Sequence, residues 1–493
     1  MELYPGRRFI CNNGKVSGFV EWISFLTYGV GHVLNDMVAS MWFTYAMVYY
    51  HYVVQLSSIN TGIVMFVGQI TDAVATAAIG VLSDKVNLSW IDRYGRRKTW
   101  HLFGSLLVNI SLPFAFSPPA FPVDSNVSEV QMCLYYCFYI VIFQIGWAAI
   151  ENSHMALVSD LTPLRDERTA LLSIRYTFTV FSNILVYVVT WVVLRSNQKS
   201  NCQIGPSEMK DFQMIVMAIL FFGVMTTLFF HIGVREPNTT RDKKKLASSA
   251  PEIVDDQFFS VFKNVTLYQT TVLYMCSRVI VNMTLVFLPM YLIDYLKLEA
   301  EKIPLLLLTM FFSSFCMSML NRRMNVRLGR KYTYSFGVIL ALCCALWCYV
   351  GNGFEYTHYD VYIVTITIGV ASSVLLVTSQ GFTTDFIGSR SHRGAFIFGL
   401  MSFSDKVSCG VIVMVVQYLR CDTCPAYYRD VMIYSWTIPA CLAFVAVVTL
   451  PNYGEVTSGR PSSVENQAQK NGQAEESENS NLETQSPCNQ QYV

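Results

Sequence analysis

Long apolar segments recur along this chain and leave few folds open to it. A helix that crosses a bilayer needs about 20 mainly apolar residues, because its backbone polar groups must be paired internally. The chain of 493 residues is 53% hydrophobic and only 14% charged, whereas soluble domains are about 25% charged. We therefore predict an all-α polytopic membrane protein. Its twelve predicted spans cover residues 23–50, 59–83, 99–117, 131–158, 172–194, 212–233, 266–294, 304–320, 332–351, 361–382, 395–419 and 431–450.

Basic residues concentrate in alternate connections between these segments. Lys and Arg cluster between the second and third spans, in the middle of the chain, and between the eighth and ninth, whereas residues 117–130 and 351–360 contain neither. The positive-inside rule then places both termini in the cytoplasm. The net charge of +1 gives no reason to expect a nucleic-acid partner. On this topology Asn126, in an Asn-Val-Ser sequon of a non-cytoplasmic loop, is a candidate glycosylation site.

A polar, charged stretch divides the apolar segments into two groups of six. We predict a cytoplasmic N-terminus at 1–22, a six-helix half at 23–233, a cytoplasmic linker at 234–263, a second half at 264–450 and a disordered cytoplasmic tail at 451–493. The tail is rich in Glu, Ser, Asn and Gln, a composition typical of disorder. Two six-helix halves are the pattern of major facilitator transporters, which bind substrate between the halves near the midplane. The chain resembles that superfamily in its basic motif after the second span, Gly95-Arg-Arg-Lys, which Gly329-Arg-Lys echoes after the eighth.

Charged residues inside the predicted spans point most directly to function. A charge at the bilayer centre costs about 2.5–3.5 kcal/mol on insertion scales, so such residues usually face a bundle interior or a water-filled path. The candidates are Asp36, Asp72, Glu151, Arg175, Arg278, Asp405 and Lys406. The acids would bind a cation or proton and a polar or zwitterionic solute, and the bases would meet a solute carboxylate or balance buried charge. The alternative is that these groups pair with one another as structural or gating bridges. His32 and His154 could relay protons, but we favour a structural role for both.

Most of the 14 cysteines lie inside predicted spans, where they act as small apolar residues. Cys421 and Cys424 lie instead in the last predicted non-cytoplasmic loop, and a disulfide between them, or to Cys202 in another such loop, fits that position. Two cysteines without a nearby His supply only half of a structural zinc site. Outside the spans we find no arrangement of nucleophile and base and no metal motif. We therefore expect neither an enzyme nor a resident cofactor or metal.

Motifs in the first half, among them Gly68-Gln-Ile-Thr-Asp72 and Arg165-Asp-Glu-Arg168, resemble the glycoside–pentoside–hexuronide:cation symporter branch of the major facilitators. In the sugar symporters of that branch, acids on the first and fourth spans and an Arg on the fifth contact substrate. Those positions resemble Asp36, Glu151 and Arg175. The resemblance of the chain to this branch recurs more weakly near the eleventh span.

The same resemblance bears on the coupling ion. Lys406 resembles a Lys that couples the cation and sugar sites of the family, and the family's cation site has two carboxylates four residues apart on the second span. Here Asp72 matches the first carboxylate, but Thr76 stands at the second. A hard cation needs several oxygen ligands, usually charged ones. We therefore expect coupling to H⁺, or facilitated exchange, in preference to coupling to Na⁺.

Three further stretches resemble an animal subgroup of this branch: 31–45, Arg96-Arg-Lys-Thr-Trp100 and Phe143-Gln-Ile-Gly-Trp147. That resemblance implies a lysosomal and melanosomal membrane protein needed for cysteine import into those organelles and affecting pigmentation. We expect a secondary transporter of a small polar solute, cysteine foremost, in a lipid bilayer; no protein partner is indicated. The alternatives are a cation- or proton-coupled sugar symporter and a non-transporting membrane scaffold or sensor.

Overall fold

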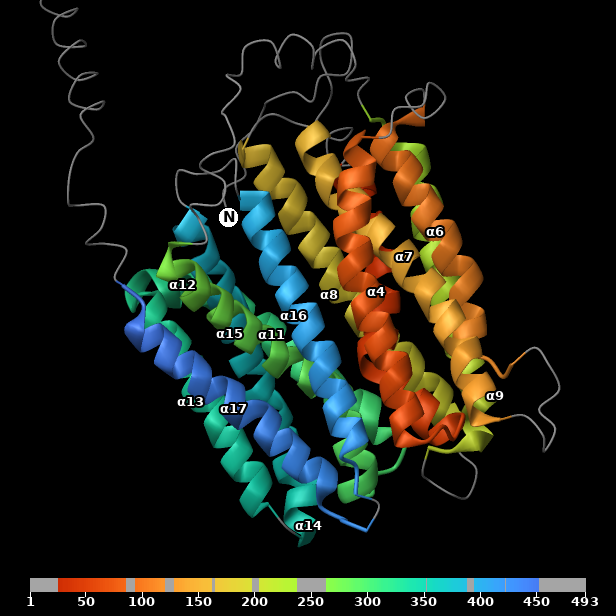
Figure 1. Ribbon diagram of the computed structural model, residues 1–493, viewed down its shortest axis with the longest axis vertical. Helices are drawn as coiled ribbons and strands as arrows, with labels where there is room; N and C mark the ends of the chain where they lie inside the picture. The colour runs from red at the N-terminus through yellow and green to blue at the C-terminus, as the bar shows by residue number, and fades with distance from the viewer. Residues whose placement is uncertain are drawn as a thin grey trace, which may run out of the picture. The chain divides into compact units, whose positions relative to one another are not determined.

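The computed structural model describes most of the chain, and its long elements are helices (Figure 1). It describes residues 25–85, 94–119, 128–161, 165–196, 204–236, 263–351, 353–387, 394–421 and 423–451. The predicted N-terminus at 1–22, most of the linker at 234–263, Asn126 and all but the first residue of the tail at 451–493 lie outside these ranges. The division into two halves with a cytoplasmic linker and tail therefore stays a prediction.

Among the described residues, ten helices are long and apolar enough to cross a membrane. Their helical cores are α4 (Ser58–Lys85), α7 (Glu129–Leu161), α8 (Arg165–Ser196), α9 (Met209–Gly233), α11 (Val265–Met290), α12 (Lys302–Arg327), α13 (Arg330–Val350), α15 (Val361–Ile387), α16 (Gly394–Tyr418) and α17 (Tyr427–Thr449). Short elements extend three of them: η3 (Pro206–Glu208), η6 (Tyr291–Tyr295), and α14 (Gly353–Glu355) with η7 (Tyr356–Asp360). An all-helical membrane protein is confirmed, whereas the count of twelve spans and the cytoplasmic termini stay predictions.

The two remaining predicted spans are helical but fall outside that set of ten. One is α6 (Arg96–Ala115), which begins with three basic residues and contains Pro113. The other is interrupted, and consists of 25–30, α2 (Val33–Ser40), η1 (Met41–Tyr45), α3 (Ala46–Val48) and η2 (Tyr49–Val53). At its first break a Cβ on Gly31 would lie 2.4 Å from the ring of Phe230. Only glycine therefore allows α9 to pack so closely against this turn.

The first and seventh predicted spans end in matching turns. The π-helix η2 is followed by Gln55 at φ 63, and the π-helix η6 by Lys297 at φ 52. In both turns a backbone N–H reaches back to the first residue of the π-helix. Asp36 and Arg278 are the same number of residues apart along the chain as Gln55 and Lys297. These two charged residues thus occupy equivalent positions of an internal repeat.

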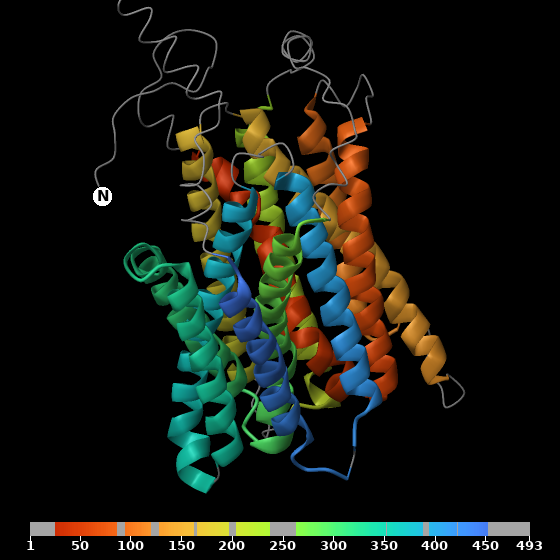
Figure 2. The same cartoon turned by 60° about the vertical axis from the view of Figure 1, so that its left-hand side comes forward.

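Helices of the two predicted halves pack against each other in two equivalent pairs. Helix α4 (orange-red) runs along α16 (blue; Figure 2), and α8 packs against α12. In the six-plus-six scheme, α4 and α12 are the second helices of their halves, and α8 and α16 are the fifth. A two-fold relation between the halves would therefore exchange one pair with the other. Helix α11 packs against η1, which brings the first and seventh predicted spans together as well.

Within the N-terminal half, α6 and α7 touch backbone to backbone. A Cβ built on Gly104 would lie 2.5 Å from the carbonyl oxygen of Gly146, and one on Gly146 would lie 2.8 Å from that of Gly104. Helices approach this closely only where both residues lack a side chain. The contact fixes α7, which carries Glu151 and His154.

Candidate functional site

Lys406 of α16 reaches across to Asp72 and Thr76 on α4. Its Nζ lies 2.7 Å from Oδ2 of Asp72 and donates to Oγ1 of Thr76 at 3.0 Å. Thr76 donates in turn to Oδ1 of Asp72, at 3.0 Å. Asp72 is only 1% exposed and Lys406 8%. The protein's own ammonium group thus sits where the resemblance placed a cation, and Thr76 adds a hydroxyl without a second charge.

Helix α7 supports this cluster from a third side. Nζ of Lys406 lies 5.5 Å from the ring centroid of Trp147, within the range of a cation–π contact. Asn152 donates from Nδ2 to the carbonyl of Thr76 at 2.8 Å. The cluster therefore joins α4 and α7 of one predicted half to α16 of the other.

Arg278 of α11 pairs with the residue before Lys406. Its Nε donates to Oδ2 of Asp405 at 3.0 Å, and Asp405 is fully buried. One turn further on, Asn282 donates to Sγ of Cys409 at 3.4 Å. Since the charge of Arg278 is already balanced by the carboxylate of Asp405, the Arg278–Asp405 ion pair has the character of a structural bridge.

Asp36 belongs to a regular ladder between the first predicted span and α8. Thr179 donates to Oδ2 of Asp36 at 2.8 Å, and Nη2 of Arg175 contacts Nε2 of His32. The same ladder continues with Ser40 to Asn183 and Thr44 to Tyr187. Successive rungs are four residues apart on both helices, so the facing side chains form one polar seam. Asp36 is also 3.6 Å from Nε2 of His32.

Two groups of opposite charge are left with few partners. Glu151, which is half-buried on α7, forms neither a hydrogen bond nor an ion pair with another described residue, although Asp36, Asp72 and Lys406 lie within electrostatic range. Arg175 contacts His32, and its Nε has no partner among the described residues. Both groups therefore have unused capacity to pair with a group of opposite charge.

The charges of the site do not cancel. Its charged residues are the acids Asp36, Asp72, Glu151 and Asp405 and the bases Arg175, Arg278 and Lys406. With neutral histidines this leaves one excess negative charge. A buried charge is expensive unless it is paired. A proton or the cationic group of a solute would balance it.

The structure brings six of the predicted binding and coupling residues into mutual contact or electrostatic range. They are Asp36, Asp72, Thr76, Glu151, Arg175 and Lys406. The seventh, Arg278, is linked to them through its ion pair with Asp405. Thr179 and Tyr187 were missed from the sequence. Each is an ordinary polar residue in an apolar helix. Only its spacing of four residues from another polar residue could have marked it as part of the polar seam. In the described part of the chain, no group of three or more His, Cys, Asp and Glu residues is arranged to hold a metal ion.

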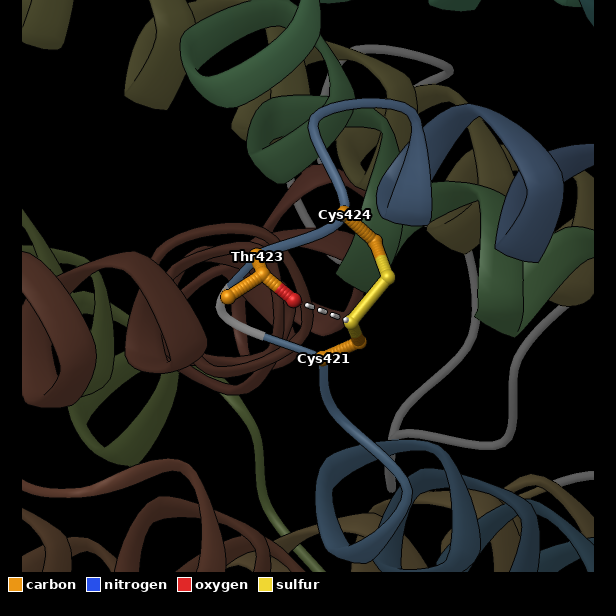
Figure 3. Close-up of a disulfide and its surroundings, with 3 residues drawn as sticks. All are labelled: Cys421, Thr423 and Cys424. Carbon is orange, nitrogen blue, oxygen red and sulfur yellow. Dashed lines mark hydrogen bonds between the residues drawn. A yellow bond between two sulfur atoms is a disulfide. The ribbon is translucent and has the colours of Figure 1, made fainter.

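A disulfide and an arginine clamp lie at the connection between α16 and α17. Cys421 and Cys424 are joined with Cα atoms 5.3 Å apart, and Thr423 Oγ1 lies 3.3 Å from Sγ of Cys421 (Figure 3). Cys202, the alternative partner, lies outside the described residues. The neighbouring Arg420 contacts His51 and, at 3.1 Å, Oγ of Ser58, both in the N-terminal half. Its Nη2 is also 3.7 Å from Asp294. Arg420 thus ties the two predicted halves together at this end.

A helical membrane bundle with an ion pair buried between its two predicted halves is typical of a transporter of small solutes. The family model "MFS/sugar transport protein" matches residues 27–422. The chain therefore belongs to this family of major facilitators, whose members are transporters and not enzymes.

Curated relatives extend this assignment. The chain is 34% identical to major facilitator superfamily domain-containing protein 12 of Homo sapiens over 433 residues, which cover 83% of this chain and 89% of that protein. It is 34% identical to the protein of the same name from Equus caballus over 431 residues, with 83% and 88% covered. The resemblance to an animal subgroup is thereby confirmed.

Solved structures share the fold. The nucleoside transporter NupG aligns with a TM-score of 0.64 at 14% identity, covering 87% of this chain and 99% of that one. The xylose transporter XylE of E. coli, in a partially occluded inward-open conformation, aligns with a TM-score of 0.63 at 14% identity, covering 90% and 100%. At this identity the likeness concerns the fold alone.

Proposed function

We propose that this protein is a secondary transporter that imports cysteine into lysosomes and melanosomes and thereby affects pigmentation. The observation that carries the proposal is a pair of oppositely charged groups, Glu151 and Arg175, that lack an ion-pair partner among the described residues and lie beside the polar seam that contains Asp36. Cysteine and the organelles come from the likeness to the animal subgroup. The site contributes the chemical class of the solute, which is a zwitterion.

A free amino acid matches both groups at once. An Arg guanidinium binds a carboxylate through two parallel N–H···O bonds, and Arg175 has its Nε unused. The ammonium group of the same solute would pair with Glu151 and balance the excess negative charge of the site. A sugar has no charge and would leave both residues unpaired in a low-dielectric protein interior, which is costly.

Coupling to H⁺ suits this site better than coupling to Na⁺. Lys406 and Thr76 already surround the carboxylate of Asp72. A sodium ion there would have to displace the ammonium group and would find a single carboxylate in its place. The negative charge left over elsewhere in the site is well suited to a proton.

Uptake of radiolabelled cysteine by isolated lysosomes tests the proposal. We expect lysosomes that contain the protein to take up more cysteine than lysosomes from cells that lack it. Reintroducing the wild-type chain, but not Glu151→Gln, should restore uptake. Equal uptake with and without the protein would overturn the cysteine assignment.

The second candidate is a cation- or proton-coupled sugar symporter, which is favoured by the name of the family and by the xylose transporters among the fold neighbours. Glycosides should then compete with the labelled solute, whereas the amino-acid proposal predicts no competition. A scaffold or sensor is the third candidate. It predicts that Asp36→Asn and Glu151→Gln leave activity intact while loss of the tail abolishes it.

A further inference from the structure

Four histidines lie in a row beside the candidate site: His32, His154 and His101 are buried, and His231 is partly exposed. The ring centroids of His32 and His154 are 5.1 Å apart, those of His154 and His101 6.0 Å, and those of His101 and His231 5.0 Å. They come from the turn before α2 and from α7, α6 and α9. The row begins next to Arg175, and its far end contacts Tyr94, which is 40% exposed.

The partners of the first two rings fix their tautomers. Nε2 of His154 lies 2.9 Å from the carbonyl of Tyr28, which can only accept, so this nitrogen carries the hydrogen. Nε2 of His32 faces the guanidinium of Arg175 and, at 3.3 Å, the amide nitrogen of Asn35. Both can only donate, so in neutral His32 the hydrogen is on Nδ1. His154 thus has a bare acceptor at Nδ1, and His32 has a donor there.

Both Nδ1 atoms are buried without a hydrogen-bond partner among the described residues. An unmatched buried polar group costs about 1–3 kcal/mol, and here the two unmatched groups are complementary and belong to neighbouring rings. Resting on the proposed function, we propose that His32 and His154 form a proton-binding pair that shares one proton through these Nδ1 atoms, directly or across one water, and that this pair carries the coupling proton.

A directed chain of hydrogen bonds lies between this pair and the surface. Nε2 of His101 donates to the Gly31 carbonyl at 2.9 Å, so its Nδ1 accepts from Nε2 of His231 at 3.1 Å. Nδ1 of His231 is then the acceptor for the hydroxyl of Tyr94 at 2.8 Å. Burial raises the pKa of Tyr94 above its ordinary value, so the phenol keeps its proton and donates. Protons reach the pair from this side when the His101 ring turns towards His154.

The charged groups that face the histidines explain how solute and proton are coupled. His32 faces Asp36 and Arg175, whereas His154 packs against Tyr28 and has Arg175 within electrostatic range. At the surface end, Lys98 lies near His101 and His231 and donates to the carbonyl of His231. A solute carboxylate that binds Arg175 would neutralise this cation and release Nε2 of His32. His32 can then carry its hydrogen on Nε2, which faces Asp36, in place of Nδ1. The bare Nδ1 of His154 receives a proton from an N–H of His101 and shares it with the bare Nδ1 of His32, so that one N–H bond breaks at His101 and one forms in the pair, and Asp36 balances the positive charge.

Proteoliposomes that contain the full chain separate coupling from solute binding. Exchange of labelled for unlabelled cysteine needs no net proton movement, whereas accumulation driven by a pH gradient does. We expect His154→Gln, whose amide can still donate to the Tyr28 carbonyl, to retain exchange within about twofold and to lose at least tenfold in accumulation. The control is His358→Gln, because His358 is an exposed histidine stacked on Phe354, and it should retain both activities. Accumulation at the wild-type level in His154→Gln would overturn the proposal.

A measurement without solute keeps this proposal separate from the cysteine assignment. In the purified chain labelled with ¹⁵N-histidine, His32→Gln should shift the Nδ1 resonance of His154 and its pH titration, whereas His358→Gln should not. If the wild type exchanges no cysteine, the proposed function fails, and this titration alone then decides whether His32 and His154 share a proton. An unchanged His154 signal in His32→Gln would then refute the shared proton.

Discussion

The ion pair between Lys406 and Asp72 yields the sharpest prediction about stability. Lys406→Met keeps the length of the side chain but leaves the Asp72 carboxylate with only the Thr76 hydroxyl. Asp72→Asn leaves Lys406 charged, with Glu151 and Asp405 still within electrostatic range. We therefore expect the lysine variant to lose more stability than the aspartate variant.

The size of the loss follows from burial. Removing one partner of a buried ion pair costs about 3–5 kcal/mol, because the remaining charge is desolvated and unmatched. Asp72 is 1% exposed and Lys406 8%, so Lys406→Met should fall in this range and Asp72→Asn below it. The matched control is Asp430→Asn. Asp430 pairs with Arg429 at 2.8 Å but has a side chain 46% exposed, and its loss should cost at most about 1 kcal/mol.

The assay is equilibrium unfolding of the purified full chain in mild detergent, followed by fluorescence of its 8 tryptophans. The double variant Lys406→Met with Asp72→Asn should recover most of the free energy of unfolding, since it removes both charges of the pair together, yet it should not transport. If Lys406→Met unfolds like Asp430→Asn, or the double variant is no more stable than Lys406→Met alone, the reasoning from buried charge is wrong.

Two further outcomes follow from the packing. Gly104→Ala should lower the free energy of unfolding by about 1–3 kcal/mol, because its methyl group overpacks the contact between α6 and α7. The control Gly80→Ala should not, since a Cβ there meets nothing within 4 Å. Equal unfolding curves for the two variants would contradict the close contact. Arg420→Gln should loosen the clamp between the halves, so that a cysteine introduced by Thr61→Cys, at a fully buried position, reacts at least several-fold faster with a membrane-impermeant maleimide. Unchanged labelling would show that Arg420 does not hold this end closed.

The helices themselves could largely be predicted from the sequence, because an apolar run of sufficient length has few alternatives to a helix in a bilayer. The third predicted span, 99–117, corresponds to α6 at Arg96–Ala115. The first span could not be drawn correctly. We predict one run over 23–50, whereas the helix breaks at Gly31, where the ring of Phe230 from far along the chain packs against the turn. Gly29 and Gly31 mark a weak point in the run, but the sequence does not show that α9 packs there.

The candidate site was predictable in kind but not in pairing. Charges inside apolar runs had to face one another or a cavity, and they do. That Lys406 pairs with Asp72, and Arg278 with Asp405, depends on how α16 lies against α4 and α11. The four histidines are scattered over the N-terminal half of the chain, and only the fold aligns them. The sequence favours a structural role for His32 and His154, and their unmatched Nδ1 atoms become visible only in the fold.

Uptake of radiolabelled cysteine into proteoliposomes reconstituted with the purified wild-type chain tests the central claim most directly. We predict uptake above that of empty liposomes. It should be inhibited by unlabelled cysteine, only weakly by cysteamine, which lacks the carboxylate that Arg175 would bind, and not by glycosides. Glu151→Gln should reduce uptake at least tenfold, since one lost charge-assisted contact is worth about 1.5–3 kcal/mol. No uptake above empty liposomes, or inhibition by glycosides and not by cysteine, would contradict the account.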